Sequence, residues 1–294
     1  MNNIDIIAAC SDLGVHVNGS QLGPEILINN INKDNIIKIN NFKKIKYDNN
    51  YVKELDKNNK KKNLNEINKF NSNLYNLVLS SLNQNNFPIV LGGDHSISIA
   101  SSLASIKKHD NLGIIWFDAH GDFHTFDTTS SGNIHGLPFA AVTGYEKNLL
   151  TDFHSGNYFN FENAVLFGAR DIDTPYEINN LKNAGITIIT TEDIKKYGLE
   201  TMCKKAFEIA SNGTEGIHIS YDLDCIDCDI APGVSIPVKN GLNLDEAYGF
   251  VDYMIKNKEK IKSIDLVELN PLRDREKITE KIATNILNKL IENI

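Results

Sequence analysis

Short runs of apolar residues alternate along this chain with segments in which apolar residues recur every three or four positions. The apolar runs are typical of strands that are buried on both faces of a parallel sheet, and the spaced pattern is typical of helices that cover such a sheet. Seven strands are predicted in this way: 5–9, 87–91, 113–117, 164–167, 186–190, 217–221 and 261–268. The alternation predicts an α/β fold with a mostly parallel sheet.

The helical pattern predicts a helix that opens near residues 23–25 and four further helices at 97–108, 201–211, 244–256 and 276–291. The stretch 40–73 is rich in Asn and Lys, and only its later part has helical spacing, so we expect its earlier part to be a solvated connection. A length of 294 residues is within the range of a single large α/β domain, and we predict one domain over 1–294.

Composition excludes several classes of function. The net charge of −8 and the absence of a basic stripe argue against nucleic acid as a partner. No run of about 18 apolar residues is present, so no membrane span is expected. Four cysteines and an N-terminus without the basic start of a signal peptide favour a cytoplasmic protein with reduced thiols.

Acidic and histidine side chains directly follow several of the predicted strands. Asp118, His120 and Asp122 follow the strand 113–117 at intervals of two residues, which places them on one face of an extended segment. Because the carboxyl ends of parallel strands meet at one edge of a sheet, residues after the other strands are expected to join them there. These are His95 in LGGDHS, Asp222 and Asp224 in SYDLD, and Glu268 in LVELNP.

This set of side chains predicts a two-metal hydrolytic centre. Carboxylates and imidazoles, with no obligatory thiolate, suit Mn²⁺ or a neighbouring first-row metal. A carboxylate can also bridge two cations, because it offers two oxygens. Two cations about 3.5–4 Å apart lower the pKa of a water held between them and so supply hydroxide at neutral pH.

Five motifs, GGDHS, DAHGD, SGNIHG, SYDLDCID and ELNP, occur in this order. With them the chain resembles the ureohydrolase family of arginase, agmatinase and formimidoylglutamase over essentially its whole length. The resemblance implies a three-layer α/β/α sandwich, two Mn²⁺ per chain and a homo-trimer or homo-hexamer. It also implies that one ion is held by His95, Asp118, Asp122 and Asp222 and the other by Asp118, His120, Asp222 and Asp224.

The loop 124–136 resembles the arginase loop without a gap. The resemblance implies that Thr129, Ser131 and Asn133 receive the α-carboxylate of an amino-acid substrate and that His135 acts in proton transfer. Asp173 in the Arg-Asp-x-Asp segment matches the residue that receives the α-amino group. Arginase is therefore the member of the family that the chain resembles most.

Three positions depart from the arginase pattern. His124 stands where an Asn usually reads the substrate carboxylate, and it is kept as a candidate substrate contact. Tyr176 stands where a Glu assists with the α-amino group, and Glu177 follows one residue late. The segment 231–237 looks closer to formimidoylglutamase, because Ile236 replaces a usual Thr.

The expected reaction is hydrolysis of L-arginine to ornithine and urea. We hypothesise that a hydroxide that bridges the metals and is oriented by Asp122 attacks the guanidinium carbon. Glu268 would pair with the planar guanidinium group, and His135 would relay a proton to the departing amine or to solvent.

Three alternatives stay open at this point. The first is another ureohydrolase activity, namely that of a formimidoylglutamase, an agmatinase or a guanidinobutyrase. The second is a single-metal deacetylase of the same fold, which would not need His95 as a ligand. The third is a metal-binding oligomer that serves as a partner-binding subunit without catalysis. Metal stoichiometry and a panel of guanidino substrates distinguish them.

The remaining candidates are interpreted as structural. His218 falls within an apolar strand and is expected in the core, whereas His16, His109 and His154 are expected at the surface. Trp116 shares the face of Asp118 and is expected to pack beneath the site. Cys225 and Cys228 form a CxxC motif, but no second such pair exists to complete a zinc site, and no redox role is expected.

Overall fold

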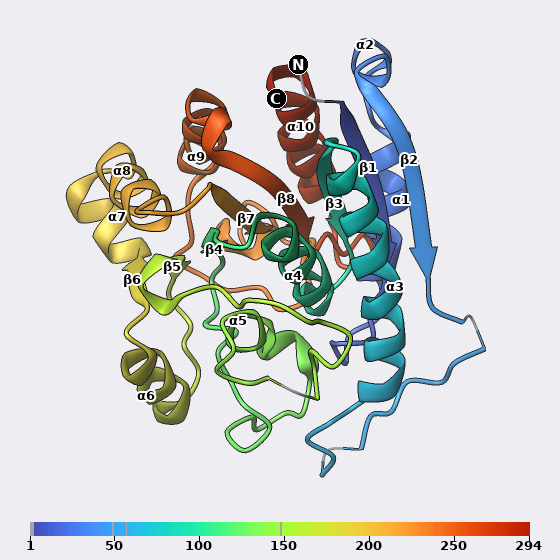
Figure 1. Ribbon diagram of the computed structural model, residues 1–294, viewed down its shortest axis with the longest axis vertical. Helices are drawn as coiled ribbons and strands as arrows, with labels where there is room; N and C mark the ends of the chain where they lie inside the picture. Colours follow the sequence, from blue (N-terminus) through green and yellow to red (C-terminus); the bar gives the residue numbers. More distant parts are fainter. Residues whose placement is uncertain (1–2, 49, 57, 148) are drawn as a thin grey trace.

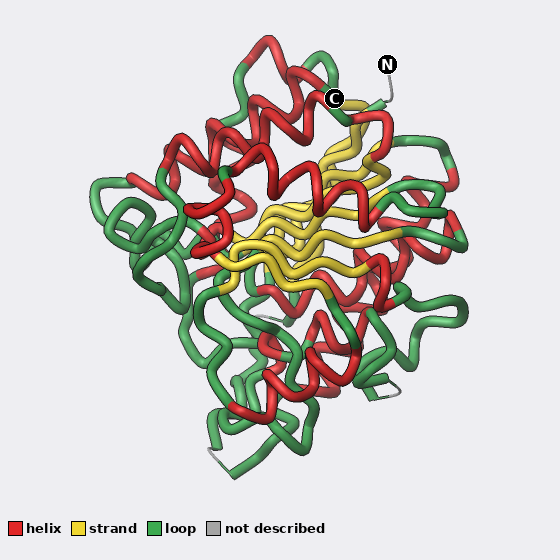
Figure 2. Tube along the Cα trace, turned by 90° about the vertical axis from the view of Figure 1, so that its left-hand side faces the viewer, coloured by secondary structure: helices red, strands yellow, loops and turns green. Residues whose placement is uncertain are grey.

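A single eight-stranded sheet forms the middle of the molecule, and helices cover both of its faces (Figures 1 and 2). The computed structural model describes residues 3–48, 50–56, 58–147 and 149–294. The strands pair in the order β2-β1-β3-β8-β7-β4-β5-β6, and every pair is parallel. Their bounds are β1 Ile4–Cys10, β2 Ile39–Lys46, β3 Phe87–Gly92, β4 Gly113–Phe117, β5 Ala164–Ala169, β6 Thr187–Thr190, β7 Ile217–Asp222 and β8 Ile261–Val267.

Two hydrophobic clusters, one on each face of the sheet, make this a three-layer α/β/α sandwich, as predicted. The α-helices are α1 Gly23–Asn29, α2 Lys33–Ile36, α3 Leu64–Asn83, α4 Ser98–His109, α5 Pro138–Val142, α6 Pro175–Ala184, α7 Thr191–Tyr197, α8 Leu199–Ala210, α9 Leu244–Lys256 and α10 Ile278–Asn293. Helices α1, α8, α9 and α10 pack on one face, and α3, α4 and α5 pack on the other.

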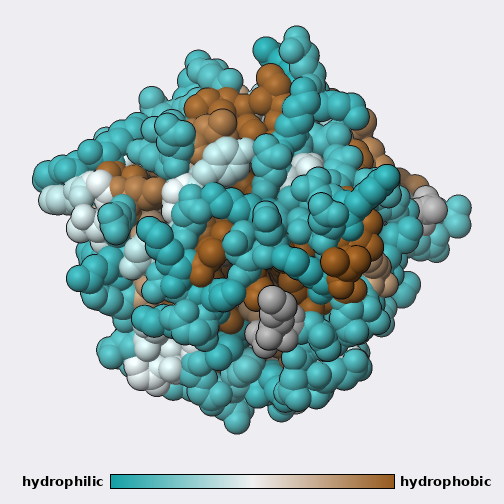
Figure 3. Space-filling view, turned by 90° about the horizontal axis from the view of Figure 1, so that it is seen from above, coloured by the Kyte–Doolittle hydropathy of each residue, from teal (hydrophilic) through white to brown (hydrophobic). Residues whose placement is uncertain are grey.

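The seven predicted strands are confirmed to within a few residues, and so are the predicted helices. Strands β1, β3, β4, β5, β7 and β8 are almost completely buried along their lengths, which explains why they are rich in apolar residues. The molecular face seen in Figure 3 is mostly hydrophilic, with small apolar patches between polar side chains. Apolar residues are thus concentrated around the sheet.

The expectation that the first part of 40–73 is only a solvated connection was wrong, because Ile39–Lys46 forms the edge strand β2 beside β1. Its residues alternate between half-buried and exposed positions, so the strand lacks an apolar run. Backbone pairing with β1 and polar contacts hold it instead. The buried carboxylate of Asp5 accepts hydrogen bonds from the Asn40 and Asn41 side chains, and the Lys43 ammonium lies 3.8 Å away.

A stack of aromatic rings anchors α9 to the sheet. The ring of Phe250 lies 4.1 Å from that of Phe117, centroid to centroid, and 5.1 Å from that of Phe167. We expect Phe250→Ala to lower the free energy of unfolding by about 3–5 kcal/mol, because the buried ring leaves a cavity. Urea denaturation measures this loss. Leu272→Ala, at a side chain that is 67% exposed, is the control and should change stability by about 0.5 kcal/mol or less; an equal effect of both variants would contradict the packing account.

Candidate active site

The predicted metal ligands and Glu268 come from four neighbouring strands in the centre of the sheet, β3, β8, β7 and β4. The arrow of β2 in Figure 1 points to the lower side of the molecule, and in a parallel sheet all carboxyl ends face that way. His95 begins a short 3-10 helix after β3, Asp118 directly follows β4, and Asp222 is the last residue of β7. The sheet therefore brings these residues to one edge.

Strand alternation does not explain why these side chains converge, and that part of the prediction was wrong. Strand β4 ends at Phe117, so Asp118, His120 and Asp122 lie in the loop beyond it. Asp122 has a φ of 48°, a left-handed conformation that an extended segment would not contain. Asp224 lies in the 3-10 helix Leu223–Cys225. Loop conformation, and not the two-residue repeat of a strand, aims the carboxylates.

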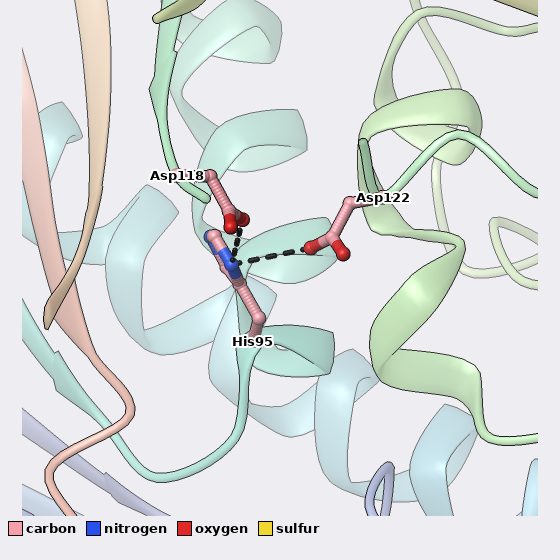
Figure 4. A group of neighbouring side chains, drawn as sticks. All are labelled: His95, Asp118 and Asp122. Atoms are coloured by element: carbon pink, nitrogen blue, oxygen red, sulfur yellow. Dashed lines mark ion pairs between the residues drawn. The ribbon is translucent and has the colours of Figure 1, made fainter. Parts of the chain in front are cut away.

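Three carboxylates surround the ring of His95. Its Nδ1 atom lies 3.0 Å from Asp118 Oδ2, 3.2 Å from Asp122 Oδ2 and 3.0 Å from Asp222 Oδ2. Figure 4 shows the His95 ring between Asp118 and Asp122. All four residues are buried. This first group of ligand atoms has the composition of a divalent-cation site.

A second group shares Asp118 with the first. His120 Nδ1 lies 2.9 Å from Asp224 Oδ2 and 3.5 Å from Asp118 Oδ1. Asp118 thus presents one carboxylate oxygen to each histidine, which is the arrangement that a bridging ligand requires. Asp222 Oδ1 accepts a hydrogen bond from the Asp224 amide at 2.8 Å, while its Oδ2 faces His95.

The two groups of side chains lack partners and positive charge that a metal ion would provide. Nδ1 of His95 and Oδ2 of Asp122 are buried and, although they lie 3.2 Å apart, neither makes a hydrogen bond among the described residues. Burial and the neighbouring Asp118 raise the pKa of Asp122, because several carboxylates share a space without enough positive charge. A divalent cation would supply both the missing partner and the missing charge.

Trp116 and Ser220 contact two of the candidate ligands, Asp118 and His95. The Trp116 indole donates to Asp118 Oδ2 at 3.0 Å and stacks on the His95 ring at 4.2 Å, which confirms that it packs beneath the site. His95 Nε2 lies 2.9 Å from the Ser220 hydroxyl, which fixes the orientation of the ring. Such contacts orient ligands and tune their affinity for the metal.

We expect Trp116→Phe to weaken metal affinity by about 10- to 100-fold, because the ring stack remains while the hydrogen bond to Asp118 is lost. Calorimetric titration of the metal-free protein with Mn²⁺ measures the change. Thermal unfolding of the metal-free variant, run alongside, separates this effect from general destabilisation. An unchanged Mn²⁺ affinity would show that Trp116 only packs.

A cavity of about 180 Å³ adjoins the second group of ligands. The cavity is lined by His120 and Asp122, together with the predicted substrate contacts His124, Thr129, Ser131, Asn133, His135 and Asp173. The sequence did not predict substrate contacts at five further lining residues: His16, Ser130, Gly136, Asp171 and Glu177. Ile236, noted for its departure from the arginase pattern, also lines the cavity. The structure therefore brings two candidate metal ligands, His120 and Asp122, and the loop 124–136 to the same cavity.

Glu268 lies at the back of the site and is not part of the cavity wall. Its Oε1 accepts a hydrogen bond from the His95 amide at 3.0 Å and lies 3.9 Å from His135 Nδ1. Its Oε2 is buried without a hydrogen-bond partner among the described residues. Burial and the nearby Asp94 raise the pKa of Glu268 to about 8, so a cation that arrives beside it would stabilise the ionised form.

Glu177, and not Tyr176, faces the cavity. Tyr176 is 67% exposed, whereas Glu177 is buried and accepts hydrogen bonds from the amides of Phe123 at 2.9 Å and Asp173 at 3.3 Å. The start of α6 explains the difference, because the Thr174 side chain caps this helix by accepting a hydrogen bond from the Glu177 amide. The Thr-x-x-Glu pattern of a helix start was the signal in the sequence that could have found it.

His124 has both ring nitrogens engaged within the chain. Nε2 lies 2.7 Å from Asp173 Oδ1, and Nδ1 lies 3.2 Å from the Thr128 hydroxyl. Glu177 Oε2 also lies near this ring, 3.7 Å from His124 Nε2. His124 thus links the loop after β4 to the acidic pair Asp173 and Glu177.

The remaining histidines and cysteines divide as follows. His218 is fully buried and bonded to Ser263 and Asp265, which confirms a core histidine. His154 was wrongly expected at the surface, because it is buried beside Tyr75. His16 is exposed but also lines the cavity, and His109 is partly buried. Cys10, Cys203, Cys225 and Cys228 are all free thiols.

The helices of the described ranges do not include one that is long and apolar enough to cross a bilayer.

A parallel α/β sandwich with clustered carboxylates and histidines at the carboxyl ends of its central strands is an arrangement suited to metal-dependent hydrolysis. The model of the Arginase family matches residues 2–292. An arginase from Brevibacillus brevis is 38% identical over 231 residues, which are 77% of this chain and 76% of that protein. This chain belongs to the arginase family.

Solved structures agree with this assignment. The arginase from Bacillus caldovelox superimposes with a TM-score of 0.92 at 30% identity, covering 99% of this chain and 98% of that one. The arginase from Bacillus cereus gives a TM-score of 0.89 at 32% identity, with the same coverage of both chains. The protein is an enzyme, an arginase-type ureohydrolase that hydrolyses amidino bonds.

Proposed function

We propose that this enzyme hydrolyses L-arginine to L-ornithine and urea and that it works with two Mn²⁺ per chain. The observation that supports the proposal most is the cavity, because its wall contains two of the candidate metal ligands, His120 and Asp122, together with polar groups suited to an amino acid. Only a substrate with a guanidino group and an amino-acid end uses all of these groups.

His95, Asp118, Asp122 and Asp222 would hold one ion, and Asp118, His120, Asp222 and Asp224 would hold the other. The mixed oxygen and imidazole donors suit Mn²⁺. When bound, two such ions lower the pKa of water and supply a nucleophile at neutral pH. Asp122, whose Oδ2 has no hydrogen-bond partner among the described residues, would orient that nucleophile.

Glu268 would pair with the guanidinium group of the substrate. Its Oε2 has no partner among the described residues, and a carboxylate matches the planar donor fork of a guanidinium. A cation at this point would also favour the charged form of Glu268, whose pKa burial raises to about 8. Position and charge both support this role.

Asp173 and Glu177 would receive the α-ammonium group, since both carboxylates lie in the cavity wall. Thr129, Ser131 and Asn133, which line the same cavity, would receive the α-carboxylate with hydroxyl and amide donors. His124 would contribute by fixing Asp173, to which it is hydrogen bonded.

His135 would carry a proton to the departing amine or to solvent. Burial and the neighbouring His120 lower its pKa to about 3, so the ring is neutral at pH 7. The ring lines the cavity and lies near Glu268 at its back. A neutral imidazole in this position can pass a proton from one nitrogen to the other side of the ring.

We also propose a cytoplasmic homo-trimer or homo-hexamer, as the family membership suggests. Light scattering of the purified protein would give a mass of three or six times 32.8 kDa. A mass of one chain would refute the oligomer and leave the reaction untouched.

The function is tested by removing metals with a chelator, adding Mn²⁺ back and following urea release from L-arginine. The proposal predicts no turnover without metal, recovery on reloading, and two Mn²⁺ per chain by elemental analysis. Full activity after chelation, or one metal per chain as in a single-metal deacetylase, would contradict it.

A further inference from the structure

Lys62 is a buried lysine beneath the loop that carries three of the proposed substrate contacts. Only 6% of it is exposed, although lysine side chains are almost never buried without a partner. Its ammonium group donates to the backbone carbonyl of Ser131 at 2.6 Å. Within the described part of the chain, no carboxylate forms an ion pair with it. The positive charge of Lys62 is therefore not neutralised by a neighbouring carboxylate.

The chain around Lys62 is built against this loop. The Lys62 amide donates to the Gly132 carbonyl at 3.3 Å, and the Lys60 ammonium donates to the Asp127 carbonyl at 2.7 Å. Gly132 has a φ of 72°, and a Cβ atom there would collide with the Asn59 carbonyl oxygen. Residues 59–62, which lie just before α3 in the chain, thus pack against residues 127–132.

Hydrogen bonds connect Ser131, which Lys62 contacts, to other residues of the cavity wall. Ser131 Oγ accepts a hydrogen bond from the Asn133 amide at 3.2 Å, and the Asn133 side chain is 3.0 Å from His16 Nδ1. All three residues line the cavity. After burial, the charge of Lys62 is the largest influence that lowers the pKa of His16. The ammonium group therefore acts electrostatically on the cavity wall.

Acidic groups of the cavity wall have the opposite charge. Asp171, Asp173 and Glu177 line the cavity together with the candidate metal ligands His120 and Asp122. A substrate with both an ammonium and a carboxylate group can place the first beside these acids and the second beside Ser131. A substrate without the carboxylate would bring only positive charge toward Lys62, which is unfavourable in a partly desolvated site.

We propose that Lys62 is a positioning residue that makes the site selective for guanidino substrates bearing a carboxylate. It does so by holding the Ser131 carbonyl and by placing a positive charge behind the loop 129–133. The inference rests on the proposed function, and it adds a residue from the Asn- and Lys-rich segment, in which no functional motif was found.

The test compares L-arginine with L-argininamide, which has a neutral amide in place of the carboxylate. We expect Lys62→Met to lower kcat/KM for L-arginine by about 10- to 100-fold, mainly through KM. The value for L-argininamide should change far less or rise. Lys62→Arg, which keeps the charge, should retain most of the preference for L-arginine. Should Lys62→Met fail to fold, Lys62→Gln replaces it as the uncharged variant.

Lys60→Met is the matched control, because Lys60 is an exposed lysine that also donates to a carbonyl of this loop. It should leave the ratio of the two substrates unchanged, since an exposed charge is screened by water. Equal losses on both substrates in Lys62→Met would reduce Lys62 to a structural support and overturn the inference. Unchanged kcat/KM for L-arginine would overturn it as well.

A binding measurement separates this inference from the proposed function. Calorimetry with L-ornithine and putrescine, which differ by the carboxylate, needs no turnover. Wild-type protein should prefer L-ornithine, and Lys62→Met should lose the preference. Wild-type protein that binds L-ornithine selectively but releases no urea from L-arginine would refute the proposed function alone, whereas an unaltered preference in Lys62→Met would refute the role of Lys62 alone.

Discussion

Asp118→Asn is expected to lower the turnover of L-arginine by about 10³-fold or more and to reduce the metal content of the protein. Asp118 Oδ2 faces His95 and Oδ1 faces His120, so one side chain belongs to both groups of ligands. Asparagine keeps the size of the side chain but removes its charge and replaces one oxygen with a donor that cannot bind a cation. Urea release and elemental analysis of the same sample measure both effects.

The matched control for this variant is Asp229→Asn, which makes the same chemical change at an exposed carboxylate in the cluster Asp227, Cys228 and Asp229. It should leave turnover and metal content at the wild-type level, because the Asp229 side chain is 74% exposed. If Asp118→Asn kept two metals and full turnover, the shared-ligand account of the site would be wrong.

His135→Asn is expected to lower kcat by about 10²- to 10⁴-fold while the metal content stays unchanged. His135 lines the cavity but is not among the clustered groups of potential metal ligands, so its loss should affect proton transfer and not metal binding. Asparagine retains a polar group of similar reach but cannot pass a proton between two ring nitrogens.

His109→Asn serves as the control for this second variant, because His109 lies at a partly buried position beside Glu215. Its turnover should match the wild type. A His135→Asn enzyme with wild-type kcat would remove His135 from the mechanism, and one that lost its metals would assign the residue to the metal centre instead.

Most of the fold could be predicted because strands of a parallel sheet with both faces covered are rich in apolar residues. Strand β4 shows this clearly, since all of its residues are apolar or glycine and all are buried. Edge strand β2 could not be found in this way. It has one neighbouring strand, and its side chains are half-buried at most, so backbone pairing and contacts to Asp5 replace an apolar pattern.

The candidate site could be predicted where its residues directly follow a strand. His95, Asp118 and Asp222 meet because their strands are neighbours around β8, and a motif at a strand end carries that information. Residues of the loop 124–136 do not directly follow a strand and were predicted through their resemblance to the arginase loop. Two further residues have neither signal. Lys62 and His16 are adjacent to the substrate loop only through the path of the chain between elements.

The central claim is that this arginase-family enzyme acts on L-arginine. Its most direct test is a steady-state assay of the Mn²⁺-loaded protein on L-arginine, agmatine, 4-guanidinobutyrate and N-formimidoyl-L-glutamate, following urea or formamide. The account predicts that kcat/KM for L-arginine exceeds the others by about a decade or more, because Asp173, Glu177 and the loop 129–133 recognise both charged groups of the amino-acid end. A preference for any other compound, or no turnover of L-arginine, would contradict it.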